Sequence, residues 1–263
     1  MPSSKYWRFK TIKKEERKRN WKFRLFYFAS SAILIIAIWA LFFSSFFKIT
    51  EVKLPKNDII AADDIYKLTA ASAPLHLGEN LFILSKNRLN VKLAAAFPEL
   101  TNISISKKPL HGLAIDFEKR TQIGIWQNNT GSYYLDKEGI IFKEAPQTEG
   151  ALILKIKDFG KNNAAPGDKV LNDGILNFII QFNNEIIARN KIKITEFEVD
   201  PAPNINFKAV TDRGWQIYLD QNQDPKSEAN SLFTTLNEAV KNGEKNLAYI
   251  DLRIPTRVFY KMK

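Results

Sequence analysis

The sequence predicts an α+β protein, in which a single transmembrane helix is followed by a β-α-α-β-β module and then by a mixed, mostly β C-terminal domain. Three observations predict this class. An uncharged apolar run lies near the start, two amphipathic helical patterns stand among strand patterns in the next part, and the remainder is dominated by short apolar strand patterns separated by turn residues. The expected boundaries are a tail at 1–24, a membrane helix at 25–47, the module at 48–118 and the domain at 119–263.

The apolar run extends from Leu25 to Phe47 without a charged residue, a proline or a glycine. As a helix with a rise of about 1.5 Å per residue, it exceeds the roughly 30 Å thickness of the hydrocarbon core of a bilayer. It is apolar on all sides, so it lacks the polar face of an ordinary surface helix. We therefore expect it to cross a lipid bilayer.

The charges beside this run predict its orientation. Residues 1–24 contain ten Lys or Arg and two Glu, a net charge of +8 out of +11 for the whole chain. Basic residues favour the cytoplasmic side and are attracted to anionic lipid headgroups. The expected topology is that of a type II protein of the cell membrane, with its N-terminus in the cytoplasm and its C-terminus outside.

Two other interpretations fit this region less well. A cleavable signal peptide has an apolar core of about 7 to 15 residues and a small-residue cleavage site, whereas this run is longer and continues through Ser44, Ser45 and Phe46. A basic tail can also bind nucleic acid, but one tethered next to the bilayer is more simply a topology signal. No nucleic-acid partner is expected.

The module should contain two helices packed against one small sheet. A strand pattern covers Phe47 to Pro55, a first helix begins at Asp63, and a second begins after Ser85 and ends before Pro98. Two alternating strands follow, and each has one apolar face. The economical way to bury these stripes and faces is to pack them against each other.

The C-terminal domain should be richer in strands, with one helix after Asn172 and another that begins at Asp224 and Pro225. Turn residues at 128–131 and 136–139 indicate hairpins. The expected strands are 122–126, 133–135, 140–142, 151–156, 192–199, 205–210, 215–219, 247–252 and 256–260.

The sequence offers little support for catalysis or for a bound cofactor. It has no cysteine, only two histidines, His76 and His111, and none of the common nucleophile or phosphate-binding motifs. Most carboxylates stand where structure explains them, as Asp63 does at a helix start. Paired carboxylates acting on cell-wall glycans remain an alternative, so a membrane-anchored cell-wall enzyme stays open. No small-molecule substrate is expected.

The terminal strand is the candidate interaction site. If it lies at the edge of a sheet, its unpaired N–H and C=O groups can accept a strand from another protein. The alternative is that Pro255 and the charges of Lys261 and Lys263 only protect this edge from pairing.

Several motifs follow one another in an order that resembles the FtsQ/DivIB family of bacterial cell-division proteins. They are Phe47-x-Ile49-x-x-Val52, Gly78-Glu79-Asn80-Leu81-Phe82, Phe97-Pro98, Ile125-Trp126, Tyr134-Leu135-Asp136 with Gly139-Ile140-Ile141-Phe142, Gly214-Trp215-x-Ile217-Tyr218-Leu219 and Ile250-Asp251-Leu252-Arg253. The resemblance covers essentially the whole chain. It departs from the family at Gln122, where a proline is usual, and at Ile254, where an aromatic is common.

The resemblance implies a POTRA domain at 48–118, an FtsQ-type β domain at 119–263 and a non-catalytic scaffold of the divisome at the septum. The implied partners are small bitopic coiled-coil proteins similar to FtsB or DivIC and to FtsL, one of which adds a strand to the β domain. The implied contact residues are Arg253, Ile254, Val258, Phe259 and Tyr260. A POTRA-bearing chaperone or secretion component is a further alternative, although the serial lipid-facing strands of an outer-membrane barrel are missing.

Overall fold

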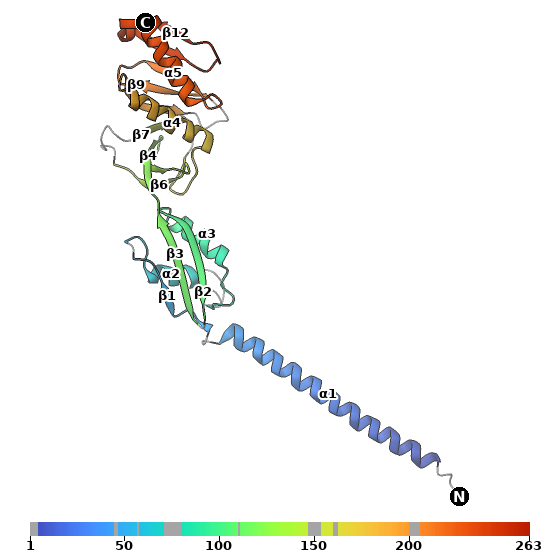
Figure 1. Cartoon of the computed structure of the whole chain (residues 1–263). Coiled ribbons are helices and arrows are strands. Elements are labelled where there is room, and N and C mark those ends of the chain that lie inside the picture. The colour runs from blue at the N-terminus through green and yellow to red at the C-terminus, as the bar shows by residue number, and fades with distance from the viewer. Residues whose placement is uncertain are drawn as a thin grey trace. The chain divides into compact units, whose positions relative to one another are not determined.

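Figure 1 shows the computed structural model, which describes residues 5–44, 47–56, 58–70, 80–109, 111–146, 154–159, 163–199 and 206–263. The chain forms two compact units, one of residues 1–92 with 104–116 and one of residues 93–103 with 117–263. An apolar N-terminal helix, a small module of helices and strands, and a mostly β C-terminal part confirm the predicted α+β class.

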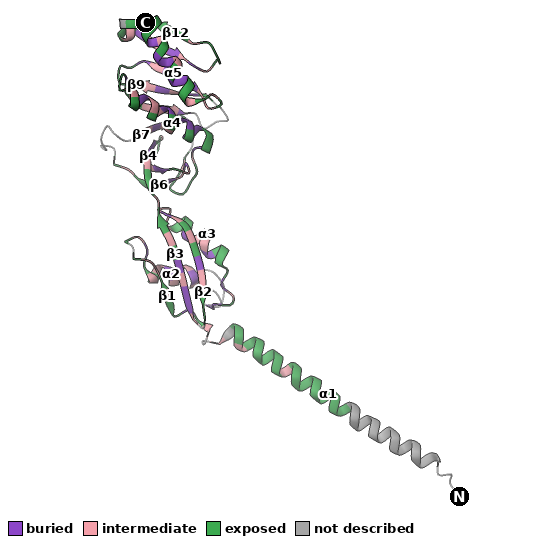
Figure 2. Ribbon diagram, in the orientation of Figure 1, coloured by how far each residue is buried: buried purple, intermediate pink, exposed green. Residues whose placement is uncertain are grey.

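Helix α1 (Lys5–Phe43) contains the apolar run. Its stretch Trp21–Phe42 is long and apolar enough to cross a membrane. Large apolar side chains remain exposed around it, as the green ribbon of Figure 2 shows, and Ile33 is 68% exposed. Such a surface is stable in lipid but costly in water. The hydroxyl of Ser31 donates to the carbonyl of Phe28 over 2.9 Å, so it needs no water.

The helix ends at Phe43, four residues before the end of the uncharged run. The reason lies in Asn80, whose side-chain amide donates to the carbonyls of Leu41, over 3.0 Å, and Phe42, over 3.1 Å. These carbonyls have no partner within the helix, because each would need an amide four residues further on. Asn80 is itself buried and therefore serves as a cap at the point where the chain leaves the helix.

The module has the predicted order, β1 (Glu51–Lys53), α2 (Ala62–Ala70), α3 (Lys86–Ala96), β2 (Leu100–Lys108) and β3 (Gly112–Lys119). Its sheet has the order β1-β3-β2, and β1 runs parallel to β3. The first strand is shorter than expected, because Lys48 forms a bridge with Asn80 instead of continuing the pairing with β3. The first unit buries Ile49, Ile65, Leu84, Leu89, Leu113 and Ile115.

The second unit is built on one mixed sheet, which in the described part of the chain has the order β12-β11-β10-β9-β8-β7-β4-β5-β6. The pairs β4–β7, β7–β8 and β10–β11 are parallel and the other pairs are antiparallel. The strands are β4 (Gln122–Gln127), β5 (Ser132–Asp136), β6 (Ile141–Glu144), β7 (Leu154–Asp158), β8 (Ile194–Val199), β9 (Asn206–Thr211), β10 (Gln216–Asp220), β11 (Leu247–Asp251) and β12 (Phe259–Met262).

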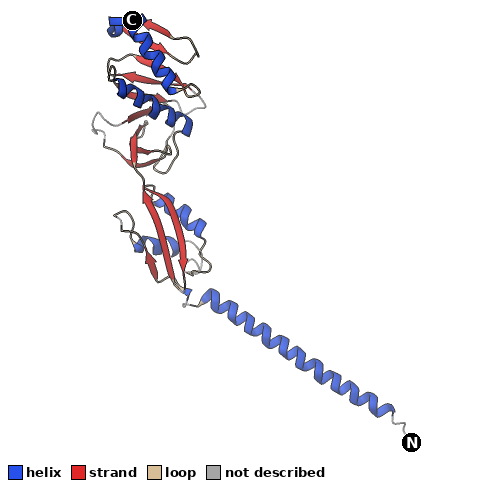
Figure 3. Cartoon of the chain, viewed as in Figure 1, coloured by secondary structure: helices blue, strands red, loops and turns tan. Residues whose placement is uncertain are grey.

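Two helices accompany this sheet, as Figure 3 shows in blue. Helix α4 (Asp173–Arg189) begins where the side chain of Asn172 accepts from the amide of Ile175. Helix α5 (Pro225–Thr235) begins where Asp224 accepts from the amide of Ser227, with proline in the first turn. The chain then continues through a π-helical turn (Leu236–Val240) and a 3₁₀ turn (Lys241–Asn246) into β11. Both helix starts were predicted from the sequence.

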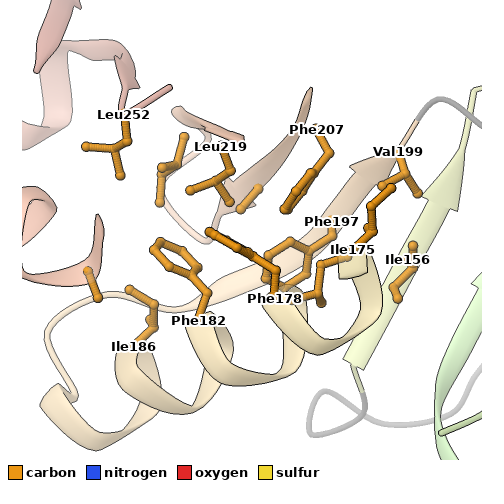
Figure 4. Close-up of a cluster of buried hydrophobic side chains, with 14 of the residues drawn as sticks. Ile156, Ile175, Phe178, Phe182, Ile186, Phe197, Val199, Phe207, Leu219 and Leu252 are labelled. Atoms are coloured by element: carbon orange, nitrogen blue, oxygen red, sulfur yellow. The ribbon is translucent and has the colours of Figure 1, made fainter. Parts of the chain in front are cut away.

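The core of the second unit lies between these helices and one face of the sheet. Figure 4 shows Phe178 and Phe182 of α4 pointing towards the side chains of the strands. Their rings are stacked at 5.9 Å, and Phe178 meets the ring of Phe207 edge to face at 5.3 Å. The fully buried Trp126 and Trp215 belong to the second unit as well. The residues on the other face of the central strands are polar or partly exposed.

Arg120 joins the segment after α3 to the turn between β5 and β6, within the second unit. Its guanidinium forms ion pairs with Asp136 and Glu138 and donates to the carbonyl of Pro98 over 3.0 Å. The side chain of Asp136 is only 4% exposed, and its other oxygen accepts from two amides of the turn. A buried carboxylate needs such partners, so this group holds the turn in place.

Candidate partner-binding edge

Strand β12 is an edge of the nine-stranded sheet and pairs antiparallel with β11. In the described part of the chain no strand pairs with its outer side. All four of its residues are exposed. The opposite edge differs, because the amide of Ile141 in β6 donates to the carbonyl of Asp168 and its carbonyl accepts from the amide of Gly167. The outer side of β12 is therefore the open edge.

The backbone groups on this outer side can be assigned. The amide of Lys263 donates to the carbonyl of Asn246 over 2.6 Å, so it points towards the segment that leads into β11. Backbone groups alternate along a strand. The amides of Lys261 and Phe259 therefore point towards β11, and those of Tyr260 and Met262 point outwards. An added strand could therefore form backbone hydrogen bonds with Tyr260 and Met262.

The terminal strand differs in position from the prediction. It was expected at 256–260 but covers Phe259–Met262. The segment 254–257 forms a turn, in which the amide of Arg257 donates to the carbonyl of Ile254 over 3.2 Å. Thr256 has a φ of 65°. This angle lies outside the β region, and a β-branched residue adopts it only under strain. Pro255 lies in this turn rather than in β12, so it removes no amide from the edge.

The side chains of β12 occupy both faces of the sheet. Tyr260 pairs with the fully buried Ile250, so it lies on the face covered by helices. Phe259 pairs with Asp251, which pairs in turn with Tyr218 of β10. Tyr218, Asp251 and Phe259 therefore form a row across three strands on the other face. Phe259 is 49% exposed, so this row ends in an aromatic side chain that meets solvent.

Arg253 is held beside this row by polar and aromatic contacts. Its Nε lies 2.9 Å and its Nη2 2.6 Å from the two carboxylate oxygens of Asp251. Its guanidinium lies 5.0 Å from the ring centroid of Tyr218, a cation–π contact. The ring of Tyr218 in turn meets the ring of Tyr249 edge to face, with 5.4 Å between the centroids. The hydrogen bonds from Arg253 lower the pKa of the Asp251 carboxyl. The arginine is thereby fixed at the end of β11.

The structure thus brings Arg253, Phe259 and Tyr260 to one end of the sheet, together with the exposed Ile254 and the half-buried Val258. Sequence reasoning missed Tyr218, Tyr249 and Asp251 as neighbours of Arg253. The spacing of Asp251 and Arg253 was a usable signal, because residues two apart in a strand lie on the same face. The position of Tyr218 depends on the parallel pairing of β10 with β11, for which the sequence carries no local signal.

The described residues contain no group of three or more histidines and carboxylates that could hold a metal ion. His76 lies outside the described residues, as do Gly78 and Glu79 of the family motif. Asp63 stands in the first turn of α2, where its charge suits the helix start, as predicted.

The arrangement defines a class of protein, a membrane-anchored α+β protein whose C-terminal sheet ends in an open strand. Residues 124–253 match the family described as cell division protein FtsQ/DivIB, C-terminal, and this range extends from β4 to Arg253. This match places residues 124–253 of the chain in the FtsQ/DivIB family, whose members are non-enzymatic cell-division proteins. A search of curated proteins gives no match. The family match ends before Ile254, so the turn 254–257 and β12 lie beyond it.

Proposed function

We propose that this protein is a non-catalytic bitopic scaffold of the bacterial divisome, which recruits and links division proteins at the septum and binds a small coiled-coil partner by addition of a β-strand to β12. The observation that carries the proposal is the open outer side of β12, which follows shortly after the residues that match the family. Backbone pairing along such an edge supplies affinity, and alternating side chains set the register.

The proposed contact surface consists of Arg253, Ile254, Val258, Phe259 and Tyr260. Phe259 and Tyr260 lie on opposite faces, so a partner strand would contact one aromatic side chain on each face of the sheet. Ile254 is 48% exposed and provides apolar area where the resemblance to the family implies an aromatic side chain. A strand with apolar or aromatic side chains beside these three residues would bury them on binding. The proposed partners are proteins similar to FtsB or DivIC and to FtsL.

The proposed topology places the tail 1–24 in the cytoplasm and the described sheets outside the cell membrane. The concentration of positive charge in the tail supports this orientation, since basic residues favour the cytoplasmic side. We also propose that residues 48–118 form a POTRA domain and 119–263 the β domain. The order of α2, α3, β2 and β3 after β1 supports the first assignment.

Photocrosslinking in living cells tests the proposal. A photoreactive amino acid replaces Ile254 in the full chain, and the matched control carries it at Glu144, which is exposed on the opposite edge strand β6. We expect the first variant, and not the control, to capture a small bitopic coiled-coil protein. We also expect depletion of the chain to produce long cells without septa. Capture of the same partner from Glu144 alone would contradict the proposed site, and normal division after depletion would contradict the proposed role.

A further inference from the structure

A cavity of about 140 Å³ lies beneath the turn that precedes β12. One wall is the turn itself, with Ile254, Thr256 and Val258, and the other is the first part of α5. Ile254 and Val258 also belong to the proposed contact surface. On the same measure a single water molecule needs roughly 10 to 15 Å³, so the cavity has room for the end of a side chain.

The most unusual residue of this cavity is Glu228 in α5, which is only 5% exposed. Neither carboxylate oxygen meets a hydrogen-bond partner of good geometry among the described residues. Burial without a partner of good geometry disfavours the charged form of this carboxyl group, so its position favours a ligand that can pair with it. Helix α5 is held by the Asp224 cap at its start and by the buried Leu232 and Phe233 further along, so the backbone of Glu228 is fixed beside the cavity.

The charges around Glu228 favour a positively charged ligand. Burial and the negative charges of Asp220, Asp251 and Asp224 raise the pKa of Glu228 to about 8, while a hydrogen bond from the backbone amide of Asp220 offsets part of this effect. The proton therefore stays on this carboxyl at neutral pH. Of the nearby cations, Arg253 is engaged with Asp251, and Arg257 lines the cavity with an exposed side chain. A second positive charge inside the cavity would meet the carboxyl groups of Asp224 and Glu228, which both line it.

The direction of the side chains connects the cavity to the open edge. Val258 directly precedes β12 and packs against the core of the second unit, and Tyr260 shares the face of the buried Ile250, so both lie on the face that the helices cover. Helix α5 covers that face, and its residue Glu228 lines the cavity together with Val258. A residue of an added strand that lies opposite Val258 would therefore point to the side of the sheet on which the cavity lies.

We propose that the cavity receives a lysine or arginine side chain from the strand bound at β12, with Glu228 as its counter-ion. This proposal rests on the proposed function. It assigns to the partner strand a basic residue at one position, opposite Val258, and thereby a register. When the cation enters, Glu228 loses its proton to solvent, so the complex gains one ion pair and releases one proton.

The test uses the full chain in lipid nanodiscs and the extracytoplasmic segment of the small bitopic partner captured by crosslinking. Isothermal titration calorimetry at pH 7 in two buffers of different ionisation enthalpy gives both the affinity and the number of protons released. We expect close to one proton per complex for the wild type. For Glu228→Gln we expect no proton release and roughly tenfold weaker binding, as is usual when a charged hydrogen bond is lost. The matched control is Glu238→Gln, which alters an exposed carboxylate after the same helix.

Replacement of each basic residue of the partner segment by glutamine completes the test. One such replacement should weaken binding to the wild type and leave binding to Glu228→Gln unchanged, because the ion pair is then already missing. Binding of the partner by the wild-type chain but not by Tyr260→Pro supports the proposed function. If Glu228→Gln then binds as tightly as the wild type and releases as many protons, the cavity proposal is overturned while the proposed function stands. If the wild-type chain does not bind the partner, both fall. An effect of Glu228→Gln that no basic residue of the partner shares would also overturn the cavity proposal.

Discussion

Arg253 donates hydrogen bonds to both carboxylate oxygens of Asp251, from Nε to one oxygen over 2.9 Å and from Nη2 to the other over 2.6 Å. The two residues are separated by Leu252 alone, which is buried, so both charged side chains stay on the opposite face of the sheet. This pair ends β11 directly before the turn that leads to the open strand, and it fixes the position of a residue that belongs to the proposed contact surface.

This pair predicts a particular dependence of stability on pH. Because the pKa of Asp251 is lowered in the folded chain, its stabilisation is present above the unfolded pKa of about 3.9 and is lost as the pH falls through the folded value. Arg253→Ala should therefore reduce the free energy of unfolding at pH 7 by less than about 1 kcal/mol, since the pair is partly exposed. Denaturant unfolding between pH 2 and pH 7 measures this, and the two curves should converge at the acid end. Curves that stay parallel would show that the pair contributes nothing through ionisation.

Proline substitutions along β12 test the assignment of its backbone groups. The amide of Tyr260 points outwards, so Tyr260→Pro should leave the pairing with β11 largely intact but remove a hydrogen bond to an added strand. We expect a loss of partner affinity of about a hundredfold, against a smaller loss for Tyr260→Ala, which keeps the amide. Lys261→Pro should instead lower stability, because its amide faces β11. Calorimetric binding and thermal unfolding of the three variants give the answer, and equal stability losses for both proline variants would contradict the assignment.

The aromatic core predicts where the second unit is most sensitive. Phe182 is fully buried and stacked on Phe178, so Phe182→Ala leaves a cavity and should cost about 3 to 5 kcal/mol of unfolding free energy. Ile187 lies on the same helix with 64% of its surface exposed. Ile187→Ala should change stability by less than about 0.5 kcal/mol. Denaturant unfolding of the two variants measures the contrast, and similar effects would mean that α4 presents a different face to the sheet.

The ion pairs of Arg120 provide a second contrast. Arg120→Ala leaves the buried Asp136 without its counter-ion and should destabilise the second unit by roughly 3 kcal/mol. Lys143→Ala removes the partly exposed ion pair with Glu99, which is worth less than about 1 kcal/mol. Thermal unfolding of both variants compares the two sites. A loss for Lys143→Ala as large as that for Arg120→Ala would contradict the importance given to burial.

Local features of the fold could be predicted from the sequence because they depend on neighbouring residues. The uncharged run indicated α1, the caps at Asn172 and Asp224 indicated α4 and α5, and Asn128 indicated the hairpin in which its side chain accepts from the amides of Thr130 and Gly131. The match over residues 124–253 confirms the resemblance to the family that the motifs indicated.

Features that depend on distant pairings could not be predicted. The edge position of β12 could not be predicted, because no local sequence pattern indicates which strand lies at the edge of a sheet. The row of Tyr218, Asp251 and Phe259 needs both the parallel pairing of β10 with β11 and the antiparallel pairing of β11 with β12. The terminal strand was placed too early because Thr256 has high strand propensity, which the turn overrides by holding it at positive φ. Glu228 gave no signal, since a glutamate in the first turn of a helix is ordinary.

Amide hydrogen exchange at β12 tests the central claim, the addition of a strand to this edge, most directly. In the free chain, the amides of Tyr260 and Met262 should exchange quickly, and those of Phe259 and Lys261 should be protected by their pairing with β11. Binding of the coiled-coil partner to the full chain in nanodiscs should slow exchange at Tyr260 and Met262 and leave the protection at Lys261 in place. A partner that binds tightly while Tyr260 and Met262 continue to exchange as in the free chain would contradict the account.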